Sequence, residues 1–350
     1  MKTVLNVKTI DTLKQPLFLG EDLSLQRYDK CKYEIFLTLF QKQFGFIWRP
    51  EEIDLTKDRG DFKKLSPNEE FIFTSNLKFQ TMMDSVIARG LPSLLQYITN
   101  PELEACVKFW EAFETIHSYS YTYIIKNLYP DASLIMDSVL EDEEILKRAK
   151  SVTEAYDALN QKFAQENDLR KQIYLTLISI NVLEAVRFYV SFACSLAFEQ
   201  NQKMCGNAKI IELIRRDEGV HMFITQNIIK ILREQPSEGF QDVIAKSRDE
   251  AIAIFMHAAQ EEKEWASYLF KDGGLIGLNE KIMHQYIEWL TDTRLEGVGL
   301  PKQFGAKNPI GWLEMDSTKK QVAPQEQEIT SYKIAASVND VAQMDFGFLE

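Results

Sequence analysis

The apolar residues of this chain recur every three or four positions over long stretches, which is the spacing of an amphipathic α-helix. Residues 33–46 carry such an apolar stripe, and Pro50 follows closely enough to end it. Similar patterns cover roughly 170–200, 207–234, 240–270 and 279–297. No sustained alternation of apolar and polar residues indicates a strand. The pattern therefore predicts an all-α fold.

Two local signals place the starts of further helices. Ser66-Pro67-Asn68-Glu69 combines a capping serine, a first-turn proline and a glutamate at the third helical position. We expect the helix that it opens to stop near Gly90. A second signal, Asn100-Pro101-Glu102, opens a helix that should run to Tyr129, before Pro130.

The chain divides into three parts by its pattern. Residues 1–25 are predicted to be an extended lead-in, and 26–317 to form one helical domain. Residues 318–350 are predicted to be a flexible tail, because the stretch from Val322 onward is acidic and has no sustained helical stripe.

One stretch, Leu175–Phe198, is apolar enough to imitate a membrane span. However, Glu184 and Arg187 lie in its middle, and each would cost roughly 2.5–3.5 kcal/mol at a bilayer centre. We therefore expect a helix buried in a large protein core rather than a membrane protein.

Composition narrows the possible partners and compartment. The chain has 40 Lys and Arg against 52 Asp and Glu, a net charge of −12, which disfavours nucleic acid and anionic membranes as partners. Its four cysteines show no CxxC spacing, and the N-terminus lacks the apolar stretch of a signal peptide, so we expect the reducing cytoplasm. Glycine-rich phosphate loops and the GxSxG motif are absent from the sequence, which removes support for nucleotide-binding and serine-hydrolase functions.

The candidate chemistry lies in two Glu-x-x-His pairs, Glu114 with His117 and Glu218 with His221. Residues three apart on a helix share a face, so each pair can hold one metal ion. The other two histidines, His257 and His284, have no matching acid and are interpreted as ordinary helix residues.

Each pair is preceded by a lone acid in an apolar setting, Asp84 before the first and Glu184 before the second. The same unit thus occurs twice, and two such helix pairs would give a four-helix bundle with four carboxylates and two imidazoles inside. That is the ligand set of dimetal-carboxylate bundles, and it suits iron or manganese better than zinc. The alternative is that these residues are surface charges on a generic bundle.

Tyr121 follows His117 by one helical turn and would project beside such a metal site. An aromatic residue on a helical stripe is more often a packing residue, but a phenol beside an oxygen-activating metal pair can be oxidised to a radical. Phe188, Phe192 and Ile214 are spaced so that they could form a dry pocket around it.

These residues together resemble the small (beta) subunit of class I ribonucleotide reductase. The resemblance covers nearly the whole chain and is carried by Trp48-Arg49-Pro50-Glu51-Glu52, Asp84, Glu114-Thr115-Ile116-His117-Ser118, Ser120-Tyr121-Thr122, the stretch from Glu184 to Phe192, Arg216-Asp217-Glu218, His221 and Val322-Ala323-Pro324-Gln325-Glu326.

The resemblance implies a ferritin-like bundle that forms a homodimer and holds two iron ions per chain, manganese being possible. Asp84, Glu114 and His117 would hold one metal, and Glu184, Glu218 and His221 the other, with Glu114 and Glu218 bridging. The metals would react with dioxygen and oxidise Tyr121 to a stable radical.

The resemblance also implies a transfer of the radical to a large subunit, which reduces the ribonucleotide. The relay within this chain would comprise Tyr121, His117, Asp217, Trp48 and, in the tail, Tyr332, with Glu326 at the subunit interface. The tail would dock on the large subunit. Two rival functions are a ferritin-type iron store and a dimetal oxygenase.

Overall fold

The computed structural model of the protein describes residues 6–313. Within that range the chain is helical, and two isolated bridges, Phe18 with Ile98 and Leu275 with Leu278, are the described β-type pairings. The predicted all-α class is confirmed. The helices are α1 (Glu34–Gly45), α2 (Thr56–Phe62), α3 (Pro67–Leu95), α4 (Pro101–Leu128), α5 (Ala132–Asp137), α6 (Glu143–Leu159), α7 (Glu166–Val182), α8 (Tyr189–Gln200), α9 (Cys205–Glu234), α10 (Gln241–Lys246), α11 (Arg248–Leu269) and α12 (Glu280–Gly297).

Side-chain caps start the two helices that the sequence signals predict. Ser66 Oγ accepts from the Glu69 amide at 3.3 Å, and the Glu69 carboxylate accepts from the Ser66 amide at 2.9 Å. The oxygen of Asn100 accepts from the Leu103 amide at 2.9 Å. Each such cap satisfies amide groups that have no partner inside the helix, which is worth about 1 kcal/mol.

The expectation that the α3 helix stops near Gly90 is wrong, since it continues to Leu95 with Pro92 inside it. Gly90 instead makes room for a neighbouring helix. A Cβ atom at this position would lie 2.5 Å from the ring of Tyr156 on α6. The glycine therefore permits close packing of α3 against α6.

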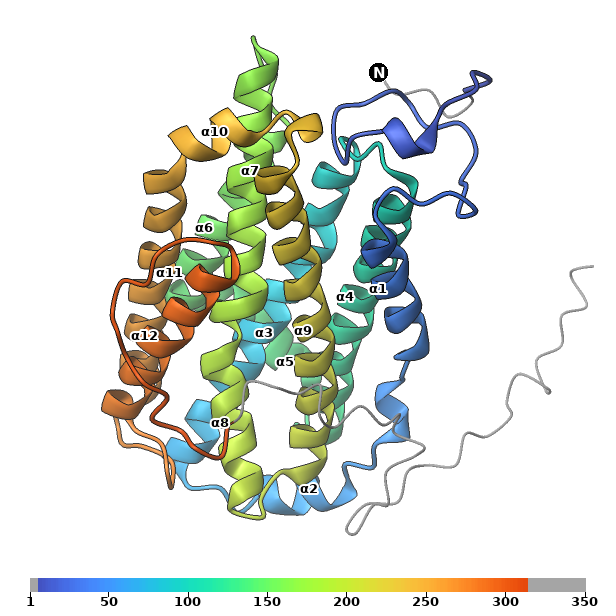
Figure 1. The fold of residues 1–350 in the computed structure, drawn as a ribbon. Coiled ribbons are helices and arrows are strands. Elements are labelled where there is room, and N and C mark those ends of the chain that lie inside the picture. The colour runs from blue at the N-terminus through green and yellow to red at the C-terminus, as the bar shows by residue number, and fades with distance from the viewer. Residues whose placement is uncertain (1–5, 314–350) are drawn as a thin grey trace, which may run out of the picture.

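The long helices α3, α4, α7, α8 and α9 form the central bundle, with α1 lying along α4 (Figure 1). The α6 helix packs on α3 and α7, while α11 and α12 cover the side of the bundle formed by α7 and the segment after it. This arrangement brings the middle of α3, α4 and α9 to the same level of the bundle. Side chains that point inward there are removed from water.

The predicted continuous helix over 170–200 is interrupted in its middle. Residues Leu183–Arg187 form a π-helical turn between α7 and α8, and Glu184 lies in that turn. The run Glu166–Gln200 is long and apolar enough to cross a membrane by length and composition, but 89% of its most apolar window is buried inside the protein. A single run of this kind is weak evidence for a span and is also what a buried core helix looks like.

A cluster of charged side chains joins this turn to α6 and α11. Arg187 donates to Glu261 Oε2 at 2.6 Å and to Ser151 Oγ at 2.9 Å, and Arg148 donates to the Glu261 carbonyl at 2.6 Å. Glu262 is fully buried beside them, and neither of its carboxyl oxygens has a hydrogen-bond partner among the described residues. Burial raises the pKa of Glu262 to about 8, against the opposing charges of Arg148 and Arg187.

This raised pKa predicts a pH-dependent stability. Between pH 4.5 and about 8 the folded protein holds a proton on Glu262 that the unfolded chain releases, so the free energy of unfolding falls as pH rises through that window. The Glu262→Gln variant has no carboxyl group to ionise at this position, so its free energy of unfolding should decrease less as pH rises. The difference from wild type should be about 1.4 kcal/mol per pH unit and reach a few kcal/mol over the window. Denaturant unfolding of metal-free protein at pH 6 and pH 8.5 measures this slope. Glu264→Gln, on the exposed side of the same helix, is the control, and an equal slope in wild type and Glu262→Gln would contradict the prediction.

Candidate metal centre

Six buried side chains meet in the centre of the bundle. Asp84 comes from α3, Glu114 and His117 from α4, Glu184 from the π-helical turn, and Glu218 and His221 from α9. All six are 0% exposed. Their ligand atoms form two overlapping groups in which every atom lies within 4.8 Å of the others: Asp84, Glu114, His117 and Glu218, and Glu114, Glu184, Glu218 and His221.

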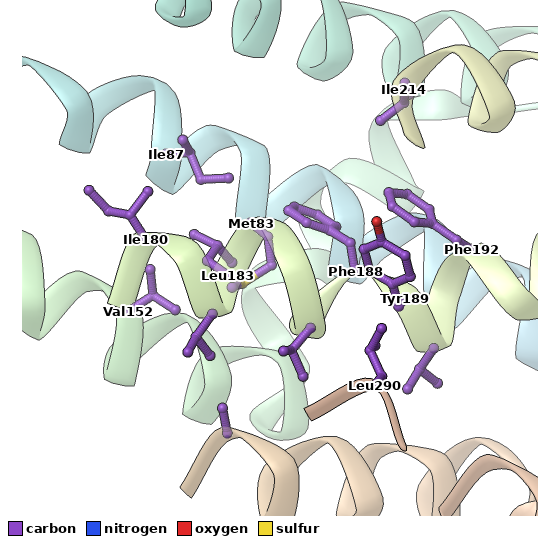
Figure 2. Close-up of a cluster of buried hydrophobic side chains, with 14 of the residues drawn as sticks. Met83, Ile87, Val152, Ile180, Leu183, Phe188, Tyr189, Phe192, Ile214 and Leu290 are labelled. Carbon is purple, nitrogen blue, oxygen red and sulfur yellow. The ribbon is translucent and has the colours of Figure 1, made fainter. Parts of the chain in front are cut away.

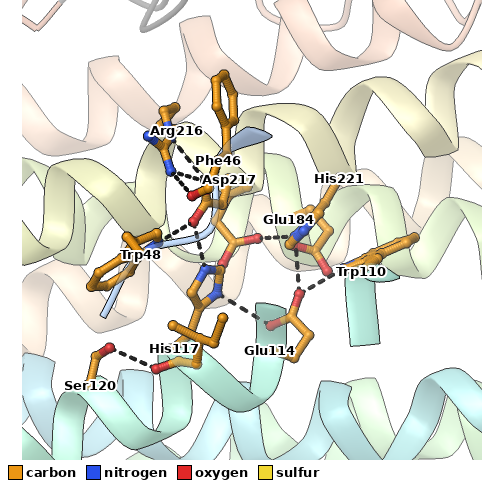
Figure 3. Close-up of polar contacts among 12 residues, drawn as sticks. Phe46, Trp48, Trp110, Glu114, His117, Ser120, Glu184, Arg216, Asp217 and His221 are labelled. Carbon is orange, nitrogen blue, oxygen red and sulfur yellow. Dashed lines mark hydrogen bonds and ion pairs between the residues drawn. The ribbon is translucent and has the colours of Figure 1, made fainter. Parts of the chain in front are cut away.

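The two groups share Glu114 and Glu218, which gives the geometry of a paired metal site. His221 Nδ1 lies 3.0 Å from Glu114 (Figure 3). It also lies 2.8 Å from Glu218, and His117 Nδ1 lies 3.1 Å from the other Glu218 oxygen. Carboxylates common to both groups can bridge two ions. The two Glu-x-x-His units and the two lone acids, which the sequence analysis expects inside one bundle, meet in this geometry.

The buried carboxylates of the cluster would be stabilised by positive charge. Burial, and then the charge of nearby carboxylates, raises the pKa of Asp84 and of Glu184 well above the ordinary range. Burial also opposes the charge on His117, but the Glu218 carboxylate raises its pKa nonetheless. Both oxygens of Asp84 and of Glu184 have no hydrogen-bond partner among the described residues. Buried carboxylates without partners are costly, so the donor set fits two divalent cations.

A hydrogen-bonded chain leads from this cluster toward the edge of the bundle. Asp217 Oδ2 accepts from Trp48 Nε1 at 2.7 Å and lies 3.3 Å from His117 Nε2 (Figure 3). Arg216 donates twice to the other Asp217 oxygen, at 3.0 and 2.8 Å. Asp217 thus fixes the outer nitrogen of His117, which leaves Nδ1 facing the carboxylates.

Tyr121 is fully buried, and its hydroxyl has no hydrogen-bond partner among the described residues. Burial, and next the charge of Asp84, raises the pKa of Tyr121 well above its ordinary value. Phe188, Phe192 and Ile214 are fully buried in one cluster of side chains, with the two phenylalanine rings stacked at 5.7 Å (Figure 2). That these three surround Tyr121 stays a prediction.

The sequence interpretation gave no role to Trp110. Its indole nitrogen donates to Glu114 at 2.6 Å, and its ring stacks on His221 at a centroid distance of 5.0 Å. It holds a carboxylate and an imidazole of the cluster at once. The sequence signal that could have identified it is its position one turn before Glu114, on the same helix face.

The other predicted residues lie elsewhere. The His257 side chain is 64% exposed, and His284 Nε2 lies 3.1 Å from the Lys263 carbonyl oxygen, so neither joins the described metal cluster. Glu326 and Tyr332 lie outside the described residues, as does the tail over 318–350.

A helical bundle with four buried carboxylates and two imidazoles in two overlapping groups defines a dimetal-carboxylate protein. Residues 26–309 match the family model "Ribonucleotide reductase, small chain". The chain belongs to the ribonucleotide reductase small-chain family, as its sequence motifs predict.

Individual relatives agree with this assignment. The chain is 44% identical to the ribonucleoside-diphosphate reductase subunit beta of Buchnera aphidicola subsp. Acyrthosiphon pisum, over 98% of each chain. It is 44% identical to the ribonucleoside-diphosphate reductase 1 subunit beta of Escherichia coli O157:H7, over 95% of this chain and 94% of the other. A ribonucleotide reductase R2 subunit from Clostridium botulinum has a similar structure, with a TM-score of 0.81, 26% identity, and coverage of 90% of this chain and 98% of that one.

Proposed function

We propose that this chain is the radical-generating β subunit of a class I ribonucleoside-diphosphate reductase. The observation that carries the proposal is the six-residue cluster at the centre of the bundle. Two of its members, Glu114 and His117, lie on the same helix as the buried Tyr121. The full-length similarity to β subunits of this enzyme supports it. The reaction that it serves is the reduction of a ribonucleotide to a deoxyribonucleotide on a large subunit.

The proposed cofactor is a pair of iron ions, with manganese as the alternative. Asp84, Glu114 and His117 would hold one ion, Glu184, Glu218 and His221 the other, with Glu114 and Glu218 shared. Oxygen-rich ligand sets with imidazole suit both metals. When bound, the metal pair supplies the reaction with dioxygen that oxidises a nearby side chain.

Tyr121 is the proposed site of the stored radical. Its burial excludes water and reductants from the phenol, which is what a long-lived radical requires. On oxidation the phenol gives up one electron and its proton. Asp84, whose negative charge acts on Tyr121, is the proposed acceptor of that proton.

The proposed transfer route runs from Tyr121 by way of His117 and Asp217 to Trp48. The 3.3 Å and 2.7 Å contacts on one Asp217 oxygen support it, because they join the cluster to the indole by hydrogen bonds alone. Tyr332 and Glu326 would continue the route in the tail, on the grounds of their sequence match. Phe188, Phe192 and Ile214 would keep the radical pocket dry.

The proposed partners are a second copy of this chain and a large α subunit, and the proposed compartment is the cytoplasm.

An aromatic patch on α1 and α4 supports the homodimer. Phe44 is 63% exposed there, and its ring packs with those of Phe40 and Phe109. Exposed apolar patches of this kind mark protein interfaces, and sedimentation velocity would show whether Phe44→Glu is monomeric.

Removal of residues 322–350 should leave the radical intact and abolish binding to the large subunit, because the tail is the proposed docking segment. Surface plasmon resonance against the α subunit measures the affinity. The full-length Tyr332→Phe variant is the control, since it should bind normally and fail only in reduction. Undiminished affinity of the truncated chain would assign docking to the bundle.

The function is tested by loading metal-free protein with ferrous iron, admitting air, and recording metal content and the electron paramagnetic resonance spectrum together. About two irons per chain with a tyrosyl radical signal is the expected result. Many irons per chain without a radical would indicate an iron store. Two irons, no radical, and turnover of a small organic substrate without a second subunit would indicate an oxygenase.

A further inference from the structure

The π-helical turn Leu183–Arg187 places one metal-site residue on an irregular backbone. In a π-helix the amides bond to carbonyls five residues back instead of four, which weakens the local hydrogen bonding and leaves carbonyl groups free for other donors. Glu184 is the only member of the six-residue cluster that this turn carries. The other five lie on regular α-helices.

The carboxylate of Glu184 has little else to hold it. Neither of its oxygens has a hydrogen-bond partner among the described residues, and His221 Nδ1 is 3.6 Å away. Glu114, by contrast, accepts from Trp110 at 2.6 Å. Apart from this long ion pair with His221, the direction in which Glu184 points depends on the backbone from which it projects.

An arginine from the outer layer of the bundle supports that backbone. Arg294 of α12 donates its Nε–H to the carbonyl of Ala185, the residue after Glu184, at 3.1 Å. Arg294 is only 3% exposed, and its guanidinium lies 5.1 Å from the ring centroid of Tyr189, just beyond the turn. Figure 2 shows Tyr189 beside Leu290 of the same α12 helix.

A second arginine holds the end of the turn. Arg187 pairs with Glu261 at 2.6 Å, and so ties the turn to α11. The turn is thus held by two neighbouring helices, by α12 through Arg294 and by α11 through the pairing of the turn's own Arg187 with Glu261. Neither α11 nor α12 contributes a residue to the six-residue cluster. Apolar side chains could fill the space around the turn at a lower free-energy cost, because a buried charge is unfavourable unless it gains a specific partner. The two buried guanidinium groups therefore indicate a specific role.

We propose that Arg294 is a positioning residue for Glu184: its bond to the Ala185 carbonyl fixes the π-helical turn so that the carboxylate faces the second metal position. This inference rests on the proposed metal assignment. Groups that orient metal ligands usually change affinity by about 10- to 100-fold when they are removed.

The test uses the full chain, freed of metal and titrated with Mn²⁺ alone, with free Mn²⁺ read by electron paramagnetic resonance. Arg294→Met, which keeps the side-chain bulk, should weaken one of the two ions by about 10- to 100-fold and leave the other near its wild-type affinity. Arg294→Lys, which keeps a charged donor, should recover most of the loss. Arg233→Met is the matched control, because Arg233 makes the same kind of bond to the Val298 carbonyl, at 2.8 Å, away from the turn.

A double-mutant cycle identifies the ion concerned. If Arg294 acts through Glu184, Arg294→Met should add nothing to the loss caused by Glu184→Ala. Additive losses, or two wild-type affinities in folded Arg294→Met protein, would overturn the inference. Should Arg294→Met not fold, Arg294→Gln, which is too short to make the bond but stays polar, carries the same expectations. A wild-type chain that fails to bind two ions would instead refute the proposed function itself.

Discussion

Replacing Tyr121 with phenylalanine should leave two metal ions per chain and remove the tyrosyl radical completely. The change removes only the buried hydroxyl of Tyr121 and keeps the ring that fills the same place in the core. The six-residue cluster keeps all its members. Metal analysis and electron paramagnetic resonance after oxygenation would record the two effects separately, and ribonucleotide reduction with the large subunit should vanish with the radical.

Tyr156 offers a matched control for this experiment. It too is buried, and its hydroxyl also has no hydrogen-bond partner among the described residues. Tyr156→Phe should therefore make a similar change in the core and retain the radical. A radical that persists in Tyr121→Phe and disappears in Tyr156→Phe would show that the wrong phenol is assigned.

Trp48→Phe should separate storage of the radical from its transfer. Trp48 is 1% exposed, bonds to Asp217 and lies with its ring 6.5 Å from that of His117. It is not one of the six residues of the cluster, so the radical and both metals should survive the change. The indole that continues the route is gone, and phenylalanine is much harder to oxidise. Reduction with the large subunit should fall to the background rate, while the radical signal stays at the wild-type level.

The control for Trp48 is Trp265→Phe, another fully buried tryptophan, which packs against Phe79 at 5.1 Å and has no bond to Asp217. It should lose stability by a similar amount and retain turnover. Normal turnover in Trp48→Phe would break the proposed route at its first step beyond Asp217. Loss of the radical in Trp48→Phe would instead mean that the indole is needed to form the site.

The sequence was informative about the cluster because its spacing rules are local. Glu114 and His117 share a helix face by their three-residue separation, and so do Glu218 and His221. The start of α3 followed from Ser66 and its capping partner for the same reason. Each of these inferences needs only a few neighbouring residues and the geometry of one helix.

Features that depend on contacts between distant segments could not be predicted in this way. Arg294 and Ala185 are 109 positions apart in the sequence, and the residues next to each of them give no signal that the two are in contact. The α6 helix was overlooked although it buries a regular face, which includes the charged Arg148. Gly90 looked like a stop signal because its real role, contact with Tyr156, lies on another helix.

The π-helical turn has a consequence for how this protein can change in evolution. A π turn is what remains when one residue is inserted into a regular helix. Deleting one residue from Leu183–Arg187 would restore ordinary hydrogen bonding but rotate everything after it by about 100°. All ten residues of Tyr189–Phe198 are buried, so no face of that segment could turn without repacking its surroundings. Single substitutions in the turn can be accommodated by repacking one side chain at a time. An insertion or deletion cannot, because the length of the turn is fixed by the metal cluster on one side and by the buried core on the other.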